Sequence, residues 1–374
     1  METLLDLFSE IERLGDREAI RFHNGFRTWK LTYRDLYRRI SGVAQHLDDM
    51  GLSKGDRLIL WGQSSHNWVV AFWAGLVRGI ELVPVDHHSS YRLVRRIQDE
   101  VNAKLLVHSH DLDADNLDLQ RLSLDLIERM PESTEPAAVN ATPDDVVEIV
   151  YTSGTTGEPK GVVHRHRHLC SNLRMFRHEI NKYKRLARPF QPIRILDLLP
   201  LSHLYGQSLG IYMPILLETS VVFTTGLHPV RIMETVRRER VSVLVAVPKL
   251  LSNLRHDVER RFELSTKRPN EGLLGAAVRW WRHRNIHSGF GWKFWALLVG
   301  GARLPPEEEE FWWRLGFVVV QGYGLTETSP VVTTNHPLKP KRGSIGSIVE
   351  GQEVKIAPDG EILVRGESVV TEYF

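Results

Sequence analysis

The chain has 374 residues, of which 42% are hydrophobic and 25% charged, and its formal net charge is +2 at pH 7. This composition is ordinary for a globular protein of about two or three domains, and the small net charge excludes a bulk attraction to nucleic acid or to a membrane. The single cysteine, Cys170, excludes an internal disulfide and a cysteine-based metal cluster, and it suits a reducing cytosol.

The N-terminal residues 1–15 place apolar side chains at helical spacing and end at Gly15, which predicts an amphipathic surface helix. Their acidic start argues against a signal peptide. The longest apolar run, residues 68–77, is about half the ~20 residues that a membrane-spanning helix needs. We therefore expect a soluble, cytoplasmic protein.

Between residues 31 and 108, predicted helices and strands alternate with short connections. The helices span residues 31–51, 65–78 and 90–101, and the strands span residues 56–61, 81–85 and 103–108. Thr32 and Asp35 have the spacing of a capping box, and Ser65 is a candidate cap of the second helix. The alternation predicts a parallel, doubly wound α/β sheet whose ligands bind at the carboxyl ends of its strands. The acidic residues 111–145 are predicted to form a surface excursion.

Residues 151–161, YTSGTTGEPKG, follow a predicted strand and are a candidate phosphate-binding loop. Glycines let the backbone present N–H groups to a polyphosphate, hydroxyl groups donate hydrogen bonds, and Lys160 supplies a positive charge. The candidate residues that precede this lysine are Thr152, Ser153, Gly154, Thr155, Thr156 and Gly157. The spacing differs from that of a Walker A motif, so an ordinary polar surface loop is an equal alternative. We interpret the adjacent His164, His166 and His168 as a basic solvated edge.

From residue 193 a second α/β pattern begins. Its predicted strands span residues 193–199, 220–224, 241–247, 296–304 and 317–320. Its predicted helices include one that ends near Leu217, one at residues 229–238 and one that starts at Pro306, where four glutamates favour a helix N-terminus. Residues 343–374 alternate at period two and predict a β-hairpin that begins a small antiparallel, barrel-like subdomain. The predicted boundaries are 1–190, 191–340 and 341–374.

Residues 255–293 carry nine Lys or Arg against four Asp or Glu, together with Trp280, Trp281 and Trp292. A peripheral contact with the inner face of a membrane is one interpretation. A solvated helical hairpin with its aromatic side chains in the core is the favoured alternative. Binding of nucleic acid is not expected, because no nucleic-acid-binding motif accompanies the segment.

A second glycine-rich turn, QGYGLTET at residues 321–328, follows the strand at 317–320. Its tyrosine suits stacking on a base, its threonine suits a phosphate, and its glutamate suits Mg²⁺. Two turns of complementary chemistry at strand ends favour a nucleotide site over an ordinary loop.

These residues form a known set of motifs. The segments TSGTTGEPKG, LPLSHLYG, VGGARL, QGYGLTETSP and GEILVRG resemble, in order and spacing, those of the adenylate-forming (AMP-binding) superfamily, over essentially the whole chain. That superfamily includes acyl-CoA synthetases, peptide-synthetase adenylation domains and luciferases. The resemblance implies attack of a carboxylate on the α-phosphate of Mg·ATP, followed by transfer of the acyl group to coenzyme A.

The resemblance also implies roles for individual residues. Residues 153–160 would wrap the β- and γ-phosphates, Tyr323 would stack on adenine, and Thr326 would hold the α-phosphate. Glu327 would ligate Mg²⁺, and His203 would lie near the substrate carboxylate. The glycine and alanine positions implied to line the nucleotide and acyl pockets are Gly300, Gly301, Ala302, Gly322 and Gly324.

Amino-acid-activating relatives carry an aspartate where this chain has Leu204, so the resemblance disfavours an α-amino acid. The apolar run at residues 209–217 and the basic, tryptophan-rich segment are more similar to fatty acyl-CoA synthetases. We therefore expect a medium- or long-chain fatty acid as the substrate.

Family members continue past GEILVRG to a ribose-binding aspartate and a C-terminal cap domain that carries a lysine for adenylation. Neither lies within these 374 residues, so the resemblance implies ATP binding with weak adenylation and no thioester formation. The alternatives are a non-catalytic nucleotide- or acyl-binding module and a half-enzyme that needs a partner chain.

Overall fold

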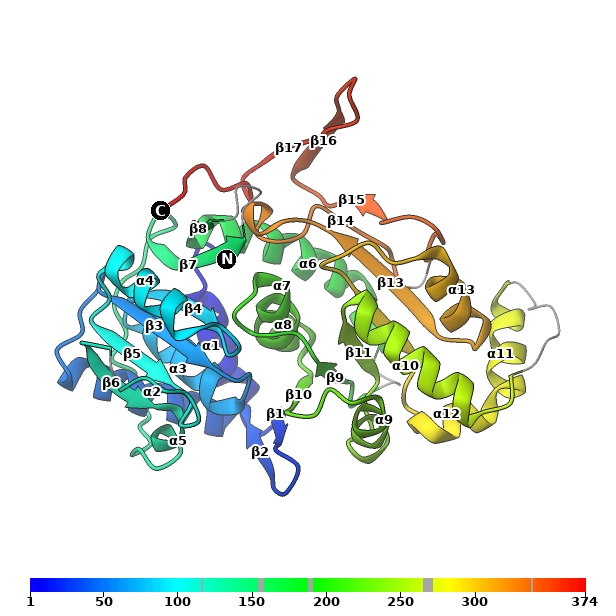
Figure 1. Ribbon diagram of the computed structural model, residues 1–374, viewed down its shortest axis with the longest axis horizontal. Helices are drawn as coiled ribbons and strands as arrows, with labels where there is room; N and C mark the ends of the chain where they lie inside the picture. The colour runs from blue at the N-terminus through cyan, green and yellow to red at the C-terminus, as the bar shows by residue number, and fades with distance from the viewer. Residues whose placement is uncertain (116, 154–157, 188–190, 265–271, 338) are drawn as a thin grey trace.

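The computed structural model describes residues 1–115, 117–153, 158–187, 191–264, 272–337 and 339–374. Two helix-covered sheets lie side by side, with helices α6, α7 and α8 between them, and a small β-hairpin projects from the upper side in the view of Figure 1. This arrangement confirms the predicted α/β class with two doubly wound sheets and a small antiparallel element.

The first sheet has six strands in the order β6-β5-β3-β4-β7-β8. These are β3 (Arg57–Gly62), β4 (Glu81–Asp86), β5 (Leu105–His108), β6 (Gln120–Ser123), β7 (Val146–Ser153) and β8 (Pro159–Arg165). All neighbours are parallel except β7 and β8, which form an antiparallel hairpin around the candidate phosphate loop. The helices near this sheet are α1 (Leu5–Leu14), α2 (Tyr33–Asp49), α3 (His66–Val77), α4 (Tyr91–Val101) and α5 (Leu124–Ile127).

The second sheet has nine strands in the order β15-β14-β13-β12-β11-β9-β10-β1-β2. Its parallel centre comprises β9 (Arg194–Asp197), β10 (Ser220–Thr224), β11 (Val243–Ala246), β12 (Ala296–Val299) and β13 (Val318–Tyr323). Its edges are β1 (Glu18–His23) and β2 (Thr28–Thr32) on one side, and β14 (Thr333–Thr334) and β15 (Ser347–Ile348) on the other.

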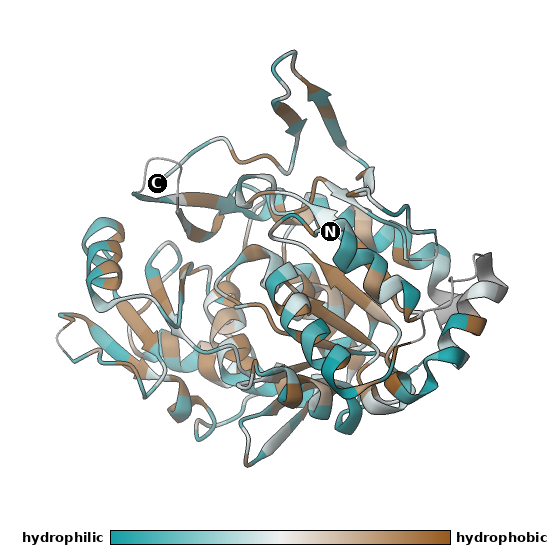
Figure 2. Ribbon diagram, turned by 45° about the vertical axis from the view of Figure 1, so that its right-hand side comes forward, coloured by the Kyte–Doolittle hydropathy of each residue, from teal (hydrophilic) through white to brown (hydrophobic). Residues whose placement is uncertain are grey.

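The helices of the second half connect these strands or cover the sheet. They are α6 (His166–Ala187), α7 (Leu204–Gln207), the π-helix η2 (Ser208–Tyr212), α8 (Met213–Leu217), α9 (Pro229–Arg238), α10 (Pro248–Arg261), α11 (Gly272–Arg282), α12 (Arg284–Phe290), α13 (Pro306–Arg314) and the 3-10 turn η3 (Thr326–Thr328). The projecting hairpin consists of β16 (Gln352–Ile356) and β17 (Ile362–Gly366). Figure 2 shows that the apolar segments gather in the sheets and the inner faces of the helices, whereas the outer faces are polar.

Helix starts follow their local sequence. The Thr32 hydroxyl accepts the Asp35 N–H, and the Asp35 carboxylate accepts the Thr32 N–H at 2.8 Å, which completes the predicted capping box of α2. Ser65 caps α3 by accepting the Trp68 N–H. Every residue of α3 is buried, because this helix lies between the sheet and the helices around it.

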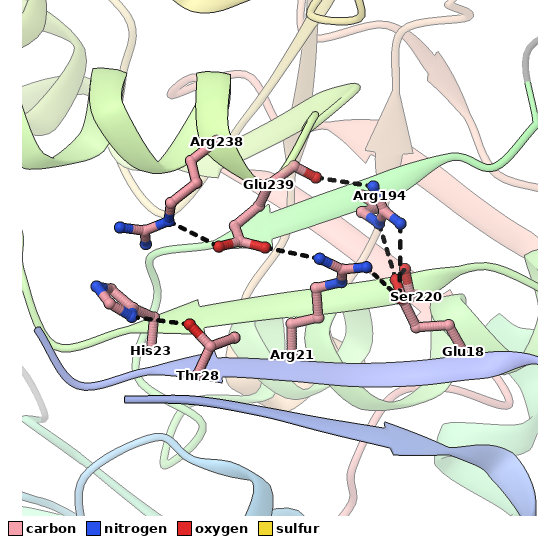
Figure 3. Close-up of polar contacts among 8 residues, drawn as sticks. All are labelled: Glu18, Arg21, His23, Thr28, Arg194, Ser220, Arg238 and Glu239. Atoms are coloured by element: carbon pink, nitrogen blue, oxygen red, sulfur yellow. Dashed lines mark hydrogen bonds and ion pairs between the residues drawn. The ribbon is translucent and has the colours of Figure 1, made fainter. Parts of the chain in front are cut away.

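The N-terminal hairpin β1–β2 belongs to the sheet formed by the second half of the chain, since β1 pairs in parallel with β10. A polar network fastens it there (Figure 3). The Glu18 carboxylate accepts from Arg194 Nε at 2.8 Å and from Ser220 Oγ at 3.0 Å, and Arg21 bridges Glu18 and Glu239. Burial acts to raise the pKa of Glu18, but hydrogen bonds from Arg21 and Arg194 lower it to about 2. The subdomain boundaries near residues 190 and 340 stay a prediction.

The prediction for residues 111–145 was wrong in part. This segment contributes β6 to the edge of the first sheet, and Ala114, Leu117 and Leu122 are buried. Its polar composition conceals the apolar side chains, which are spaced too irregularly to predict a strand.

Candidate functional site

Two turns leave the nine-stranded sheet along one edge, at residues 300–302 and 321–328. Because β9, β11, β12 and β13 are parallel neighbours, their carboxyl ends meet there. Val299, the last residue of β12, pairs with Gln321 of β13, so Gly300 leaves β12 beside the end of β13 at Tyr323. The sheet therefore brings together the turn at residues 300–302 and the turn at residues 321–328, as the sequence predicts.

The turn at residues 300–302 receives an aromatic ring from α7. A Cβ on Gly300 would lie 2.6 Å from Tyr205 Cζ, so the absent side chain is what lets the ring approach. Gly301 has φ +78°, a conformation that favours glycine, and Ala302 is exposed beside it. His203 precedes α7 as its N-cap residue and is exposed, so its ring is accessible from solvent.

The turn at residues 321–328 is folded tightly back on the chain. A Cβ on Gly324 would lie 1.7 Å from the carbonyl oxygen of Pro330, whereas at Gly322 the nearest atom would be 3.4 Å away. The Thr328 hydroxyl accepts the Leu325 N–H at 2.9 Å and holds η3 closed. Half-buried residues of this turn include the predicted Tyr323, Thr326 and Glu327.

The candidate phosphate loop lies at the tip of the β7–β8 hairpin. Thr152 pairs across the hairpin with Lys160, which is exposed, and Ser153 ends β7. The predicted Gly154, Thr155, Thr156 and Gly157 lie outside the described residues. Their role in binding phosphate stays a prediction.

Tyr373, which no motif in the sequence singles out, contacts both the β7–β8 hairpin and the turn at residues 321–328. Its hydroxyl donates to Glu327 Oε1 at 3.2 Å, and Lys160 Nζ lies 5.7 Å from the centre of its ring. Partial burial and the charge of Glu327 raise the pKa of this phenol. Nothing in the local sequence distinguishes Tyr373 from a surface tyrosine, because its contacts are more than 40 residues away in the chain.

Side-chain hydrogen bonds join β8 and helix α6 to residues 329–331, which follow η3. His164 Nδ1 lies 3.1 Å from the hydroxyl of Ser329. The Asn172 side chain of α6 accepts the Val331 N–H at 3.2 Å. These buried contacts hold β8 and α6 against the segment that follows the turn at residues 321–328.

The prediction of a basic solvated edge at the three alternating histidines was wrong. His164, His166 and His168 are all buried, and burial lowers the pKa of His164 to about 3 and of the other two to about 4. Neutral rings then accept backbone N–H groups: His166 from Leu4 at 3.1 Å and His168 from Arg165 at 3.2 Å. The histidines are therefore structural parts of the interface around α6.

A small cavity of about 20 Å³ lies between α6, the α7–η2–α8 helical segment and residues 329–331. Its walls are mainly apolar and include Leu173, Phe176, Leu209, Met213 and Val331. Tyr205, which also touches the turn at Gly300, contributes to the wall. The cavity thus adjoins the edge of the sheet where the turns meet.

A buried carboxyl group lies on β7. Glu148 is 0% exposed, and burial raises its pKa to about 8, so it is mostly protonated at neutral pH. Gln207 Nε2 donates to its Oε2 at 2.8 Å and thereby links β7 to α7.

The basic, tryptophan-rich segment forms the end of α10, α11, α12 and the turn that follows. Trp281 and Trp292 are 66% and 57% exposed, contrary to the expectation that the aromatic side chains lie in the core. The guanidinium of Arg284 lies over the ring of Trp281 at 5.1 Å. Within the described ranges, every helix is too short or too polar to cross a bilayer.

The comparisons with known proteins agree on one family. The family described as AMP-binding enzyme matches residues 7–374. The long-chain-fatty-acid–CoA ligase FadD15 of Mycobacterium bovis is 26% identical over 395 residues, which cover 92% of this chain and 64% of the relative. The putative fatty-acid–CoA ligase fadD11 of Mycobacterium tuberculosis is 30% identical over 260 residues, which cover 62% of this chain and 44% of the relative. The chain therefore spans less than two thirds of the length of these curated relatives.

Solved structures share the fold. The inhibitor-bound N-terminal domain of FACL13 from Mycobacterium tuberculosis superposes with a TM-score of 0.78 at 21% identity, over 100% of this chain and 91% of that one. The O-succinylbenzoate coenzyme A synthetase MenE of Bacillus subtilis, in complex with ATP and magnesium, superposes with a TM-score of 0.75 at 21% identity, over 98% of this chain and 72% of that one.

Proposed function

Because the chain belongs to the family of AMP-binding enzymes, we propose that its site activates a carboxylic acid as the acyl-adenylate. A carboxylate oxygen attacks the α-phosphorus of ATP, the bond from that phosphorus to the bridging oxygen breaks, and pyrophosphate leaves with the electron pair. The observation that carries the proposal is that Lys160 of β8, in the first sheet, and Glu327 of η3, which follows β13 of the second sheet, both contact Tyr373.

The residues present fit a magnesium ion that arrives with the nucleotide. Among the described residues no group of three metal-ligating side chains exists, so a dedicated protein cage is absent from that part of the chain. Mg²⁺ is usually bound by one or two carboxylates together with substrate phosphates. Glu327 supplies one such carboxylate, and Mg²⁺ there would neutralise charge on the phosphates.

The proposed roles of the remaining predicted residues follow from where they lie in the fold. Tyr323 and the backbone of residues 300–302 lie at neighbouring strand ends and would hold the adenine. Thr326 precedes Glu327 on η3 and would donate to the α-phosphate, while Lys160 would hold the departing pyrophosphate. His203 would lie by the acid's carboxylate. These groups contribute by orientation and by stabilisation of charge.

We further propose that the acid is a medium- or long-chain fatty acid and that coenzyme A takes the acyl group in a second step, for which these 374 residues alone do not suffice. The apolar walls of the cavity between α6 and η2 favour an aliphatic chain over a charged acid. The cavity of about 20 Å³ is the size of roughly one water-sized probe. An acyl chain would therefore enter only when side chains of α6 and η2 move.

Exchange of labelled pyrophosphate into ATP tests the proposal. The chain is assayed with fatty, aryl and amino acids, alongside calorimetric binding of Mg·ATP. We expect the chain to bind Mg·ATP and to exchange pyrophosphate into ATP only when a fatty acid is present. The exchange rate should fall about 100-fold in Glu327→Gln, as is typical for the loss of one charge-stabilising group. The matched control is Glu361→Gln, at an exposed position next to β17. Exchange with aryl acids alone would refute the fatty-acid assignment, and absence of Mg·ATP binding would refute the function. Binding without exchange would favour the binding-module alternative.

We also propose that the surface of α11 and α12 contacts an anionic membrane. Residues 272–293 contain no acidic side chain, and apart from the buried Arg279 their basic side chains are half-buried or exposed: Arg282, Arg284 and Lys293. The exposed Trp281 and Trp292 suit an interface. Sedimentation with vesicles of phosphatidylglycerol and phosphatidylcholine tests this. Binding should require the anionic lipid and should fall in the double variant Trp281→Ser, Arg284→Ser; equal binding by the variant would refute it.

A further inference from the structure

The segment of residues 367–374, here named the strap, lies against β8 and the turn at residues 321–328. The Val370 N–H donates to the carbonyl of Glu327 at 2.8 Å, and the Phe374 N–H donates to the carbonyl of Gly161 at 2.7 Å. Tyr373 forms an antiparallel bridge with Val162 of β8. The strap is therefore bonded through its backbone to both turns of the proposed site.

Side-chain contacts also hold the strap in this position. Ser368 is buried and accepts a hydrogen bond from Gln352 Nε2 at 2.8 Å. Glu367 forms an ion pair with Arg174 of α6, and Glu372 forms one with Arg165 of β8. With its backbone held at both ends, the strap fixes where the ring of Tyr373 lies.

The exposure of Tyr373 indicates that the ring is not there to fill the core. The residue is 56% exposed, so it removes little apolar area from water. Its contacts are instead with two charged groups of the proposed site, Glu327 and Lys160. Among the described residues, the phenol is the hydrogen-bond partner of Glu327 Oε1, and no hydrogen bond reaches Oε2.

We propose that Tyr373 is a positioning residue of the nucleotide site, whose hydroxyl orients the carboxylate of Glu327 toward Mg²⁺ and whose ring places the ammonium of Lys160 toward the phosphates. The inference rests on the proposed function. A phenol that donates to one carboxylate oxygen fixes the rotation of the carboxylate and directs the other oxygen to the metal. Loss of such an outer partner typically weakens metal affinity by about 10- to 100-fold.

Two variants separate the two contacts. Tyr373→Phe removes the hydroxyl but keeps the ring near Lys160 and the backbone bonds of the strap. Tyr373→Met removes the ring as well. Tyr37→Phe is the matched control, because Tyr37 lies on α2, half-buried against Phe8 and away from both turns. Since Tyr373→Phe loses only one exposed hydroxyl, the melting temperature of this variant should equal that of the unmodified chain.

The readout is the dissociation constant for ATP, measured by calorimetry at about 0.1 mM and about 10 mM free Mg²⁺. In the unmodified chain magnesium should tighten binding. In Tyr373→Phe that tightening should shrink by about 10-fold while affinity at low magnesium stays the same, and Tyr373→Met should weaken binding at both concentrations. If Tyr373 had only a structural role in the strap, Tyr373→Phe would lower the melting temperature, and magnesium would tighten ATP binding as much as in the unmodified chain. We call this tightening the magnesium increment.

The possible failures are distinct. If the unmodified chain does not bind ATP at either magnesium concentration, the proposed function is wrong. If the unmodified chain shows the magnesium increment and Tyr373→Phe shows the same increment, Tyr373 has no positioning role and the proposed function stands.

Discussion

Replacement of the buried Glu148 by glutamine should make the protein more stable, and increasingly so as pH rises. The carboxyl group is 0% exposed, and burial raises its pKa from 4.5 to about 8 in the folded state. Between these two values the folded chain holds a proton that the unfolded chain has lost. Stability therefore falls as pH rises through this range.

The magnitude follows from the gap between the two pKa values, which is 8 − 4.5, or about 3.5 units. At ~1.36 kcal/mol per unit, wild-type stability should fall by roughly 4–5 kcal/mol relative to the variant between pH 4.5 and pH 8. Glutamine has the shape of the protonated acid and keeps an acceptor for the Gln207 amide, so the two proteins should be similar at low pH.

The assay is urea unfolding of both proteins at pH 5, 6, 7 and 8 without ligand. Glu361→Gln, on the exposed hairpin, is the control and should show no such trend. A constant difference between wild type and Glu148→Gln across the four pH values would refute the reasoning, because it would mean that Glu148 does not hold its proton in the folded state.

Two further predictions concern other parts of the molecule. Gly324→Ala should destabilise the chain by about 1–3 kcal/mol and weaken ATP binding, because the new Cβ would lie 1.7 Å from the carbonyl oxygen of Pro330. The control is Gly322→Ala, whose Cβ has room and which should fold normally. Equal urea midpoints and equal ATP affinities of the two variants, the affinities measured by calorimetry, would contradict this. Arg194→Met should cost roughly 1–3 kcal/mol at pH 7 by removing a partner of Glu18. Because the pKa of Glu18 is lowered, that loss should shrink as pH falls from 4.5 to about 2, and urea unfolding over this range measures it.

Local sequence was sufficient for most helices and central strands. Thr32 with Asp35, and Ser65 with the apolar run after it, mark helix starts through contacts within three residues of the cap. Strands such as β10 are short apolar runs between turn residues, and the prediction of residues 220–224 coincides with its bounds. Such elements are set by neighbours in the chain, so the sequence alone specifies them.

The elements that were missed depend on distant partners. The hairpin β1–β2 has a turn signal in Asn24-Gly25, flanked by alternating apolar residues, but only its pairing with β10 shows which sheet it joins. The histidines at the junction of β8 and α6 were misjudged because a sequence does not reveal burial. His164 would be solvated at a surface, but here the fold buries it and lowers its pKa, which keeps the ring neutral.

For the candidate site, motif spacing predicted the turns at residues 300–302 and 321–328, which the parallel register of β12 and β13 brings together. The links between the turns could not be predicted. His164 with Ser329, and Tyr373 with Glu327, join residues that are remote in the chain and carry no local signature. A motif identifies the groups that meet the ligand, while the groups that hold them in place become visible only in the fold.

The pairing of β1 with β10 also sets an order for folding during synthesis. Ile20 pairs with Val221, about 200 residues later, and at ~5–20 residues per second the ribosome needs roughly 10–40 s to make that stretch. Throughout that time Ala19, Ile20 and Phe22, which are buried in the finished protein, have no sheet to join. The first strand to be synthesised thus has only β2 as a partner until β10 is made, and a nascent chain that stalls before residue 224 presents an apolar strand edge open to aggregation or to a chaperone.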